Sequence, residues 1–185
     1  MTAFLLFGVL FLITGVIYPL FVTGVAELAF PSQAHGSLVR NESGAIIGSE
    51  LIGLQFRGPL YFEGRPSSTA GAPYNAALSG GSNLGPSNPA LMDNVNFSIR
   101  HLESMGMKGP WPGDLVTSSG SGLDPHITLD AALLQVPVIA DARGMTREDV
   151  RSLVYQNTIS NPFFQGYEYV NVFALNRALD KRGIP

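Results

Sequence analysis

The sequence contains no cysteine among its 185 residues, which excludes disulfide scaffolds, thiolate zinc sites and cysteine nucleophiles. Charged residues are also scarce, at 14% against roughly 25% in a typical soluble protein. The formal net charge of −3 argues against a nucleic-acid-binding protein, which normally carries a basic face. The sequence also lacks a Gly-Lys-Ser/Thr phosphate loop and a paired-histidine zinc motif. We therefore expect no metal site and no nucleic-acid partner.

The shortage of charge is concentrated at the N-terminus, where residues 2–26 carry no charged side chain. As an α-helix this run would extend about 37 Å, enough to cross a hydrocarbon core of roughly 30 Å. A secretory signal cleaved after Ala26 is the alternative, although such a signal normally has a basic start and a shorter apolar stretch. We expect an uncleaved transmembrane anchor over residues 1–26, surrounded by the lipid bilayer, and a connector over residues 27–35.

Two small residues of this anchor, Gly8 and Gly15, lie seven positions apart and hence on the same helical face. Small residues let a neighbouring helix approach closely, so this pair is a candidate packing site for a partner helix. Pro19 lacks a backbone donor, which predicts a kink in the distal third of the helix. The short tail before the anchor is easiest to leave in the cytoplasm, which favours an external position for the rest of the chain.

The remaining residues, 36–185, predict a single extramembrane domain of the α+β class. Segments 37–40 and 45–47 flank a polar turn and predict a β-hairpin, with 60–62 as a third strand that pairs with it. Residues 167–173 are also β-prone. Apolar periodicity and capping residues predict helices that start at Pro89 and end before Gly106, and that cover 129–142, 147–156 and 174–181.

Residues 118–126 contain the residue types of a serine hydrolase. Ser119 or Ser121 would be the nucleophile, His126 the base and Asp124 the orienting carboxylate. The strained Gly-x-Ser-x-Gly elbow is absent, and close sequence neighbours rarely converge as a triad requires. A glycine-rich loop in which the carboxylate caps the following turn is the competing interpretation. A membrane-anchored hydrolase that uses Ser121, Asp124 and His126 stays an alternative function.

A second glycine-rich segment, residues 78–89, leads into the first helix predicted for the domain. Glycine allows a ligand to approach backbone N–H groups closely, and a helix N-terminus favours anions. The chain carries no Lys or Arg between Arg65 and Arg100, so charge for a triphosphate would have to come from elsewhere. An ordered turn is the alternative. The candidate nucleotide-binding residues are Ser79, Gly80, Gly81 and Ser82.

Arg57 and Arg65 bracket an aromatic stretch, residues 59–62. Two guanidinium groups at this spacing could clamp an anionic group of a partner. The alternative is ordinary stacking of arginine side chains on neighbouring aromatic rings.

Taken together and in order, several segments carry more information than any one motif: residues 48–56, 61–67, 73–75, 79–89, 114–117, 119–127, 135–136 and 170–176. In this set the chain resembles the KdpC family, the C subunits of the Kdp potassium-transporting ATPase. The resemblance runs from the N-terminal anchor to the terminal helix.

The resemblance implies a single-span accessory subunit of a bacterial inner-membrane complex that takes up K⁺ at the expense of ATP. Its implied partners are a channel-like potassium-binding subunit, a P-type ATPase subunit and a small membrane subunit. The family member is thought to assemble these subunits and to act as a catalytic chaperone that raises the affinity of the pump for ATP. The chain lacks the Asp-Lys-Thr-Gly phosphorylation sequence, so a non-catalytic subunit is expected. It needs no cofactor of its own, and ATP would be contacted only together with the ATPase subunit.

Direct contact with ATP conflicts with the expected topology. In this family the segment from Leu78 to Ser82 has been likened to the signature of ABC ATPases, but Ser82 stands where that signature usually has glutamine. The nucleotide site of the pump is cytoplasmic, whereas the domain is expected on the outer, periplasmic side. An effect on ATP affinity would then be transmitted through the membrane by differential contact with conformations of the pump.

Overall fold

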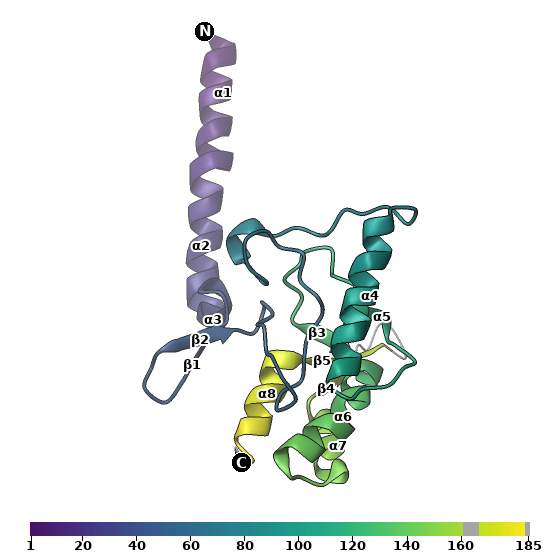
Figure 1. Cartoon of the computed structure of the whole chain (residues 1–185). Coiled ribbons are helices and arrows are strands. Elements are labelled where there is room, and N and C mark those ends of the chain that lie inside the picture. The colour runs from purple at the N-terminus through teal and green to yellow at the C-terminus, as the bar shows by residue number, and fades with distance from the viewer. Residues whose placement is uncertain (161–166, 184–185) are drawn as a thin grey trace. The chain divides into compact units, whose positions relative to one another are not determined.

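The computed structural model describes residues 1–160 and 167–183. The chain forms two compact units, Met1–Ser49 and Glu50–Pro185. The first contains a long apolar helix and a β-hairpin, and the second combines helices with a small sheet (Figure 1). The α+β class and the N-terminal apolar helix predicted from the sequence are confirmed.

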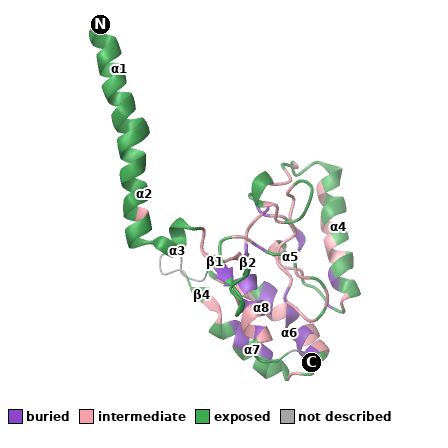
Figure 2. Ribbon diagram, turned by 90° about the vertical axis from the view of Figure 1, so that its left-hand side faces the viewer, coloured by how far each residue is buried: buried purple, intermediate pink, exposed green. Residues whose placement is uncertain are grey.

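The apolar helix of the first unit spans Thr2–Ala29, with a mean hydropathy of 2.5 and no part of its apolar window buried. Figure 2 shows it exposed along nearly its whole length. A helix that is apolar all round and unburied is typical of a membrane span. It consists of α1 (Thr2–Leu12), the π-helical turn η1 (Ile13–Ile17) and α2 (Tyr18–Ala29).

The turn η1 ends at Ile17, two residues before Pro19, where the sequence predicts a kink. Proline has no N–H for the α-helical bond to the preceding turn, and here the Tyr18 N–H donates to the Ile13 carbonyl in the wider π pattern. The ribbon keeps its direction through this turn in Figures 1 and 2. The lost donor therefore appears as a change of helical type, and the predicted kink is wrong.

The β-hairpin predicted near residue 40 is confirmed. The short helix α3 (Pro31–Ala34) precedes it, and β1 (Leu38–Arg40) pairs antiparallel with β2 (Ile46–Ser49). In the turn the Asn41 carboxamide oxygen accepts a hydrogen bond from the Ala45 N–H at 2.9 Å. Contacts within the chain group this hairpin with the apolar helix, in the first unit.

The second unit is built on a three-stranded antiparallel sheet of order β3-β5-β4. Its strands are β3 (His126–Thr128), β4 (Thr158–Ser160) and β5 (Glu168–Asn171). The helical elements of this unit are η2 (Ala76–Leu78, a 3₁₀ turn), α4 (Pro89–Ser104), α5 (Gly113–Val116), α6 (Leu129–Arg143), α7 (Arg147–Gln156) and α8 (Val172–Asp180).

The core of the second unit lies where α6, α7 and α8 meet the sheet, and Figure 2 shows the buried residues gathered there. α6 packs along α7, and α8 packs against α7 and β5. The side chains are mainly aliphatic, and the fully buried apolar ones include Phe62, Ile127, Val136, Ile139, Val150, Val154, Val170, Leu175 and Leu179. The region between residues 50 and 88 contributes Phe62 to this core through an irregular path.

Capping residues set the helix boundaries much as the sequence predicts. α4 begins after Asn88, whose side-chain oxygen accepts from the Ala90 N–H at 3.0 Å. α7 begins after Thr146, whose hydroxyl oxygen accepts from the Asp149 N–H at 3.1 Å. α6 ends at Gly144, which has a left-handed backbone with φ of 63°.

Two strand predictions need correction, and two strands were missed. Residues 60–62 form no strand, because side chains instead of a strand satisfy their backbone, as described below. The β-prone stretch 167–173 ends as a strand at Asn171, which caps α8 by accepting from the Ala174 N–H at 3.0 Å, so its last two residues are helical. Strands β3 and β4 were not predicted, because each has only three residues and too little alternation to be recognised.

Candidate functional site

The two glycine-rich segments, far apart in the sequence, lie against each other in the second unit. The Gly80 N–H donates to the Ser121 carbonyl at 2.9 Å, and the Ser79 hydroxyl donates to the same oxygen at 3.1 Å. A Cβ added at Gly81 would lie 3.0 Å from the carbonyl oxygen of Gly120. Glycine is needed here so that the two backbones can touch.

Gly122 closes this contact. It has φ of +67°, and a Cβ at this position would come within 2.6 Å of the Gly80 carbonyl oxygen. Its own carbonyl accepts a hydrogen bond from the Ser67 hydroxyl at 2.7 Å, and that hydroxyl oxygen accepts from the Tyr74 N–H at 2.9 Å. Three loop segments are therefore locked together by backbone contacts and one serine.

Tyr74 occupies the space beside two further glycines. Its ring lies where a side chain at Gly53 would be, and its hydroxyl oxygen would be 2.7 Å from a Cβ at Gly64. The hydroxyl donates to the Arg65 carbonyl at 2.6 Å. Burial, with a smaller contribution from the negative charges of Asp124 and Glu63, raises the pKa of Tyr74 to about 12. The phenol is a neutral structural donor.

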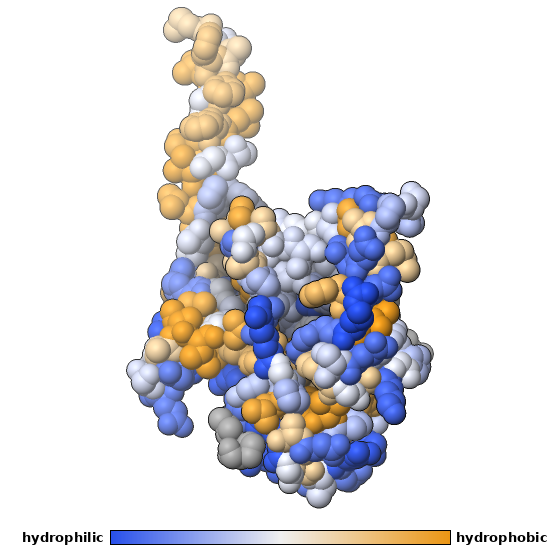
Figure 3. All heavy atoms as spheres, in the orientation of Figure 1, coloured by the Kyte–Doolittle hydropathy of each residue, from blue (hydrophilic) through white to orange (hydrophobic). Residues whose placement is uncertain are grey.

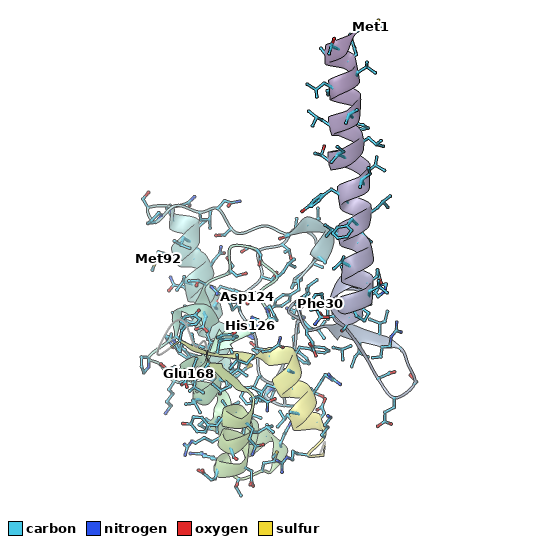
Figure 4. All side chains as sticks on the ribbon, turned by 180° about the vertical axis from the view of Figure 1, so that it is seen from behind. Met1, Phe30, Met92, Asp124, His126 and Glu168 are labelled. Carbon is cyan, nitrogen blue, oxygen red and sulfur yellow. The ribbon has the colours of Figure 1, made fainter. Side chains whose placement is uncertain are left out.

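A charged cluster at the start of β3 joins Asp124, His126 and Arg65. One Asp124 oxygen accepts from the His126 N–H at 3.0 Å and lies 3.2 Å from its Nδ1, and the other is 3.3 Å from an Arg65 nitrogen. Burial opposes the charged carboxylate, but the hydrogen bonds from His126 and the Arg65 charge outweigh it, so the pKa of Asp124 is lowered. Figure 4 shows Asp124 and His126 next to each other.

The hydrolase triad predicted from the sequence is not assembled. Asp124 does orient His126, but the Ser121 hydroxyl oxygen accepts from the Leu123 N–H at 3.1 Å and lies 3.4 Å from the Ser119 hydroxyl. Within the described residues, Ser121 forms no hydrogen bond with His126. The serines instead stabilise the loop, as the alternative interpretation expects, and Asp124 caps the turn through the His126 N–H.

The candidate nucleotide-binding residues are divided between two roles. Ser79 and Gly80 use their donors on the neighbouring loop, and Gly81 packs on it. Ser82 instead borders a cavity of about 680 Å³ beside α4. The Ser79 hydroxyl and the Gly80 N–H, two donors that a phosphate would need, are thus already engaged.

The histidines and acidic residues do not form a metal site. In the part of the chain that the structure describes, no group of three or more metal-binding side chains occurs. Each histidine instead faces one carboxylate: His35 faces Glu27, His101 faces Glu63 and His126 faces Asp124.

Three buried polar side chains that sequence reasoning missed fix the path of residues 60–63. The Gln135 carboxamide bonds both backbone groups of Glu63, at 2.8 and 3.1 Å, and the Asn176 carboxamide does the same for Phe62. Arg143, whose side chain is 1% exposed, donates to the Leu60 carbonyl at 2.6 Å and pairs with an acidic residue of α8. Polar residues inside otherwise apolar helices were the pattern that could have revealed them.

The fold and site define a class of protein: a small α+β domain that follows one helix of the length and composition of a membrane span. Among its described residues, the domain has no assembled hydrolytic or metal centre. Comparison with known sequences is consistent with this class. The sequence model of KdpC, described as "K+-transporting ATPase, c chain", matches residues 1–181. The chain therefore belongs to the KdpC family.

Individual relatives extend over almost the full chain. A "Potassium-transporting ATPase KdpC subunit" of Methanosphaerula palustris is 48% identical over 182 residues, which cover 97% of this chain and 95% of the relative. Relatives with the same description from Janthinobacterium sp. (strain Marseille) and Polaromonas naphthalenivorans are 50% and 52% identical, covering 97% and 96% of this chain and 96% and 92% of the relatives. The chain is a subunit of a potassium-transporting ATPase complex, and its apolar helix supports a single-pass membrane protein.

Proposed function

We propose that this chain is the non-catalytic accessory subunit of a high-affinity, ATP-driven potassium-uptake complex. In this role it assembles and stabilises a channel-like ion-binding subunit, a P-type ATPase subunit and a small membrane subunit. The match to the family over residues 1–181 carries this proposal. The observation that Ser121 and His126 bond other groups, and not each other, supports the non-catalytic role.

The proposed location is the inner membrane, with the second unit on the outer side. From there the chain would act as a catalytic chaperone: it would raise the ATP affinity of the pump by binding one conformation of the pump more tightly than another. Direct contact of ATP with Ser79–Ser82 is the less favoured proposal, because the donors of Ser79 and Gly80 are engaged within the domain. Protease digestion of intact spheroplasts tests the topology: we expect cleavage of residues 50–185, and full protection would exclude an outer position.

Gene deletion tests the accessory role. We expect a strain without this chain to stop growing at micromolar K⁺, and the remaining subunits to separate during purification in detergent. A plasmid-borne copy of the full chain should restore both properties. Normal assembly and growth without the chain would overturn the proposal.

A further inference from the structure

The cavity beside α4 lies within the second unit. It is lined by one side of α4, by residues around Phe56 and Arg65, and by the end of α5. Its volume is about 680 Å³, within the range of roughly 300–1,000 Å³ that is usual for binding pockets. Figure 3 shows this hollowed face of the molecule.

The inner side of α4 presents an amphipathic face to this space. Leu91, Asn94, Val95, Ser98 and Leu102 line the cavity and recur at three- and four-residue intervals, which places them on one helical face. Leu102 is buried in the core, but the residues toward the N-terminal end of the helix are only half-buried or exposed. An apolar helical stripe normally packs on another element. Val95 packs against the core from this face, but Leu91, one turn nearer the N-terminus of α4, is only half-buried at the cavity.

Two large apolar side chains of α4 are exposed. Phe97 lines the cavity and is 70% exposed, and Met92 is 56% exposed. Figure 4 shows Met92 projecting outward from α4. An exposed aromatic side chain at a groove, with an exposed methionine elsewhere on the same helix, is characteristic of protein interfaces.

The charge at the rim favours an acidic occupant. Arg57 lines the cavity, is exposed and donates to the Gln55 side chain at 3.1 Å, and it forms no ion pair with any described residue. The other charged groups of the cavity are engaged, because Arg65 pairs with Asp124, and Glu63 pairs with His101 at 2.9 Å. Arg57 is therefore the cation of this cavity that remains available to a carboxylate.

We propose that the α4 groove, the cavity lined by Arg57, Leu91, Asn94, Val95, Phe97 and Ser98, receives a peptide segment of another subunit of the potassium-transporting complex. The segment carries an aliphatic or aromatic side chain that packs on α4 and an Asp or Glu that pairs with Arg57. This inference rests on the proposed function, and it assigns the surface by which the second unit holds a partner.

The polar lining distinguishes a peptide from the other occupants. In the described part of the chain, the Asn94 and Ser98 side chains have no hydrogen-bond partner, and both line the groove. An acyl chain of a lipid would cover them without replacing their bonds to water, which costs free energy, whereas peptide N–H and C=O groups satisfy them. A nucleotide triphosphate would need more than the one unpaired guanidinium and would face the Glu63 carboxylate.

Site-specific photo-crosslinking in the assembled complex tests the proposal. The photoreactive residue benzoylphenylalanine replaces Asn94 in the full chain, and replaces Glu103 as the control, because position 103 lies on the opposite face of the same exposed helix. We expect a crosslink from position 94 to one segment of a partner subunit, mapped by mass spectrometry, and none or far less from position 103. Crosslinks from position 94 to lipid or nucleotide, or equal crosslinking from both positions, would overturn the proposal.

A charge exchange tests the role of Arg57. Arg57→Glu should weaken retention of the chain in the purified complex by about tenfold, as expected for the loss of a partly desolvated charge pair. Replacement of the mapped acidic residue of the partner by Arg should restore it, while Arg182→Glu, at another exposed cation, should have no effect. Failure of the exchange to restore retention would reject the ion pair. If the charge exchange fails but the chain is still required for assembly, the proposed accessory function is retained and only the proposed peptide-binding role of the α4 groove is rejected.

Discussion

The side-chain amide of Asn176 in α8 forms two hydrogen bonds with the backbone of Phe62. Its oxygen accepts from the Phe62 N–H at 2.9 Å, and its nitrogen donates to the Phe62 carbonyl at 2.8 Å. Gln135 in α6 does the same for Glu63. Because a neighbouring strand would pair the same N–H and carbonyl groups, two side chains take the place of a strand here.

Replacement of Asn176 by alanine should destabilise the second unit strongly. The change leaves the buried N–H and carbonyl of Phe62 without partners, and each unsatisfied buried group costs about 1–3 kcal/mol. We therefore expect Asn176→Ala to lower the free energy of unfolding by about 2–4 kcal/mol, measured by denaturant unfolding of the full chain in detergent. Asn96→Ala, at an exposed position of α4, is the control and should change little. A loss for Asn176→Ala no larger than for the control would contradict the structural role.

The glycine contact between the loops gives a second prediction. Gly122→Ala places a Cβ at 2.6 Å from the Gly80 carbonyl oxygen at a residue with φ of +67°. Since the steric clash and the backbone strain add, we expect a loss of about 2–4 kcal/mol in unfolding free energy.

Gly120 is the matched control for this change, because a Cβ at Gly120 meets nothing within 4 Å. Gly120→Ala should leave the unfolding midpoint nearly unchanged, although both glycines lie in the same loop. Equal effects of the two substitutions would show that glycine is needed there for flexibility and not for contact.

Much of the helical structure could be predicted from the sequence, because its causes are local. Asn88 and Thr146 are capping residues that precede apolar periodicity, and the helices start directly after them. The anchor could be predicted because an uncharged run of this length is rare outside membrane spans and secretory signals.

The site could be predicted only in part, because its contacts join distant segments. The glycine-rich loops were recognised as unusual, but nothing local shows that Gly80 bonds Ser121 or that Tyr74 fills the space beside Gly53. The failed strand at 60–62 has the same cause: the side chains that bond its backbone belong to Arg143 and Asn176, 83 and 114 positions away. The α4 groove depends on which half of α4 is covered, which the helix pattern does not reveal.

The lowered pKa of Asp124 predicts a pH dependence of stability. In the folded state the pKa of Asp124 lies below its ordinary value of 3.8. The charged carboxylate therefore stabilises the fold above pH 3.8, and this stabilisation is lost as the pH falls through the lower pKa of the folded state. Asp124→Asn should therefore be less stable than the parent by about 1 kcal/mol near neutral pH, with a difference that shrinks below pH ~4.

The control for this measurement is Asp93→Asn, at an exposed carboxylate of α4. Asp93 forms no ion pair or side-chain hydrogen bond with any described residue, so this substitution should leave the unfolding temperature close to that of the parent. Thermal unfolding of the three proteins from neutral to acidic pH gives the comparison, and a difference for Asp124→Asn that stays constant with pH would refute the charge-based explanation.

The last prediction concerns the face of the apolar helix that carries Gly8 and Gly15. A Cβ at Gly8 would meet nothing within 4 Å, and at Gly15 only the Phe11 ring at 3.6 Å, so the chain itself accepts larger residues there. If a partner helix packs on this face, Gly8→Leu and Gly15→Leu should each reduce copurification of the partner subunits without reducing the amount of chain in the membrane. Gly24→Leu is the matched control, because Gly24 lies beyond the π-helical turn, in α2, and also has free space around it. Equal copurification of all three variants would mean that these glycines face lipid, and the helix would then serve as an anchor alone.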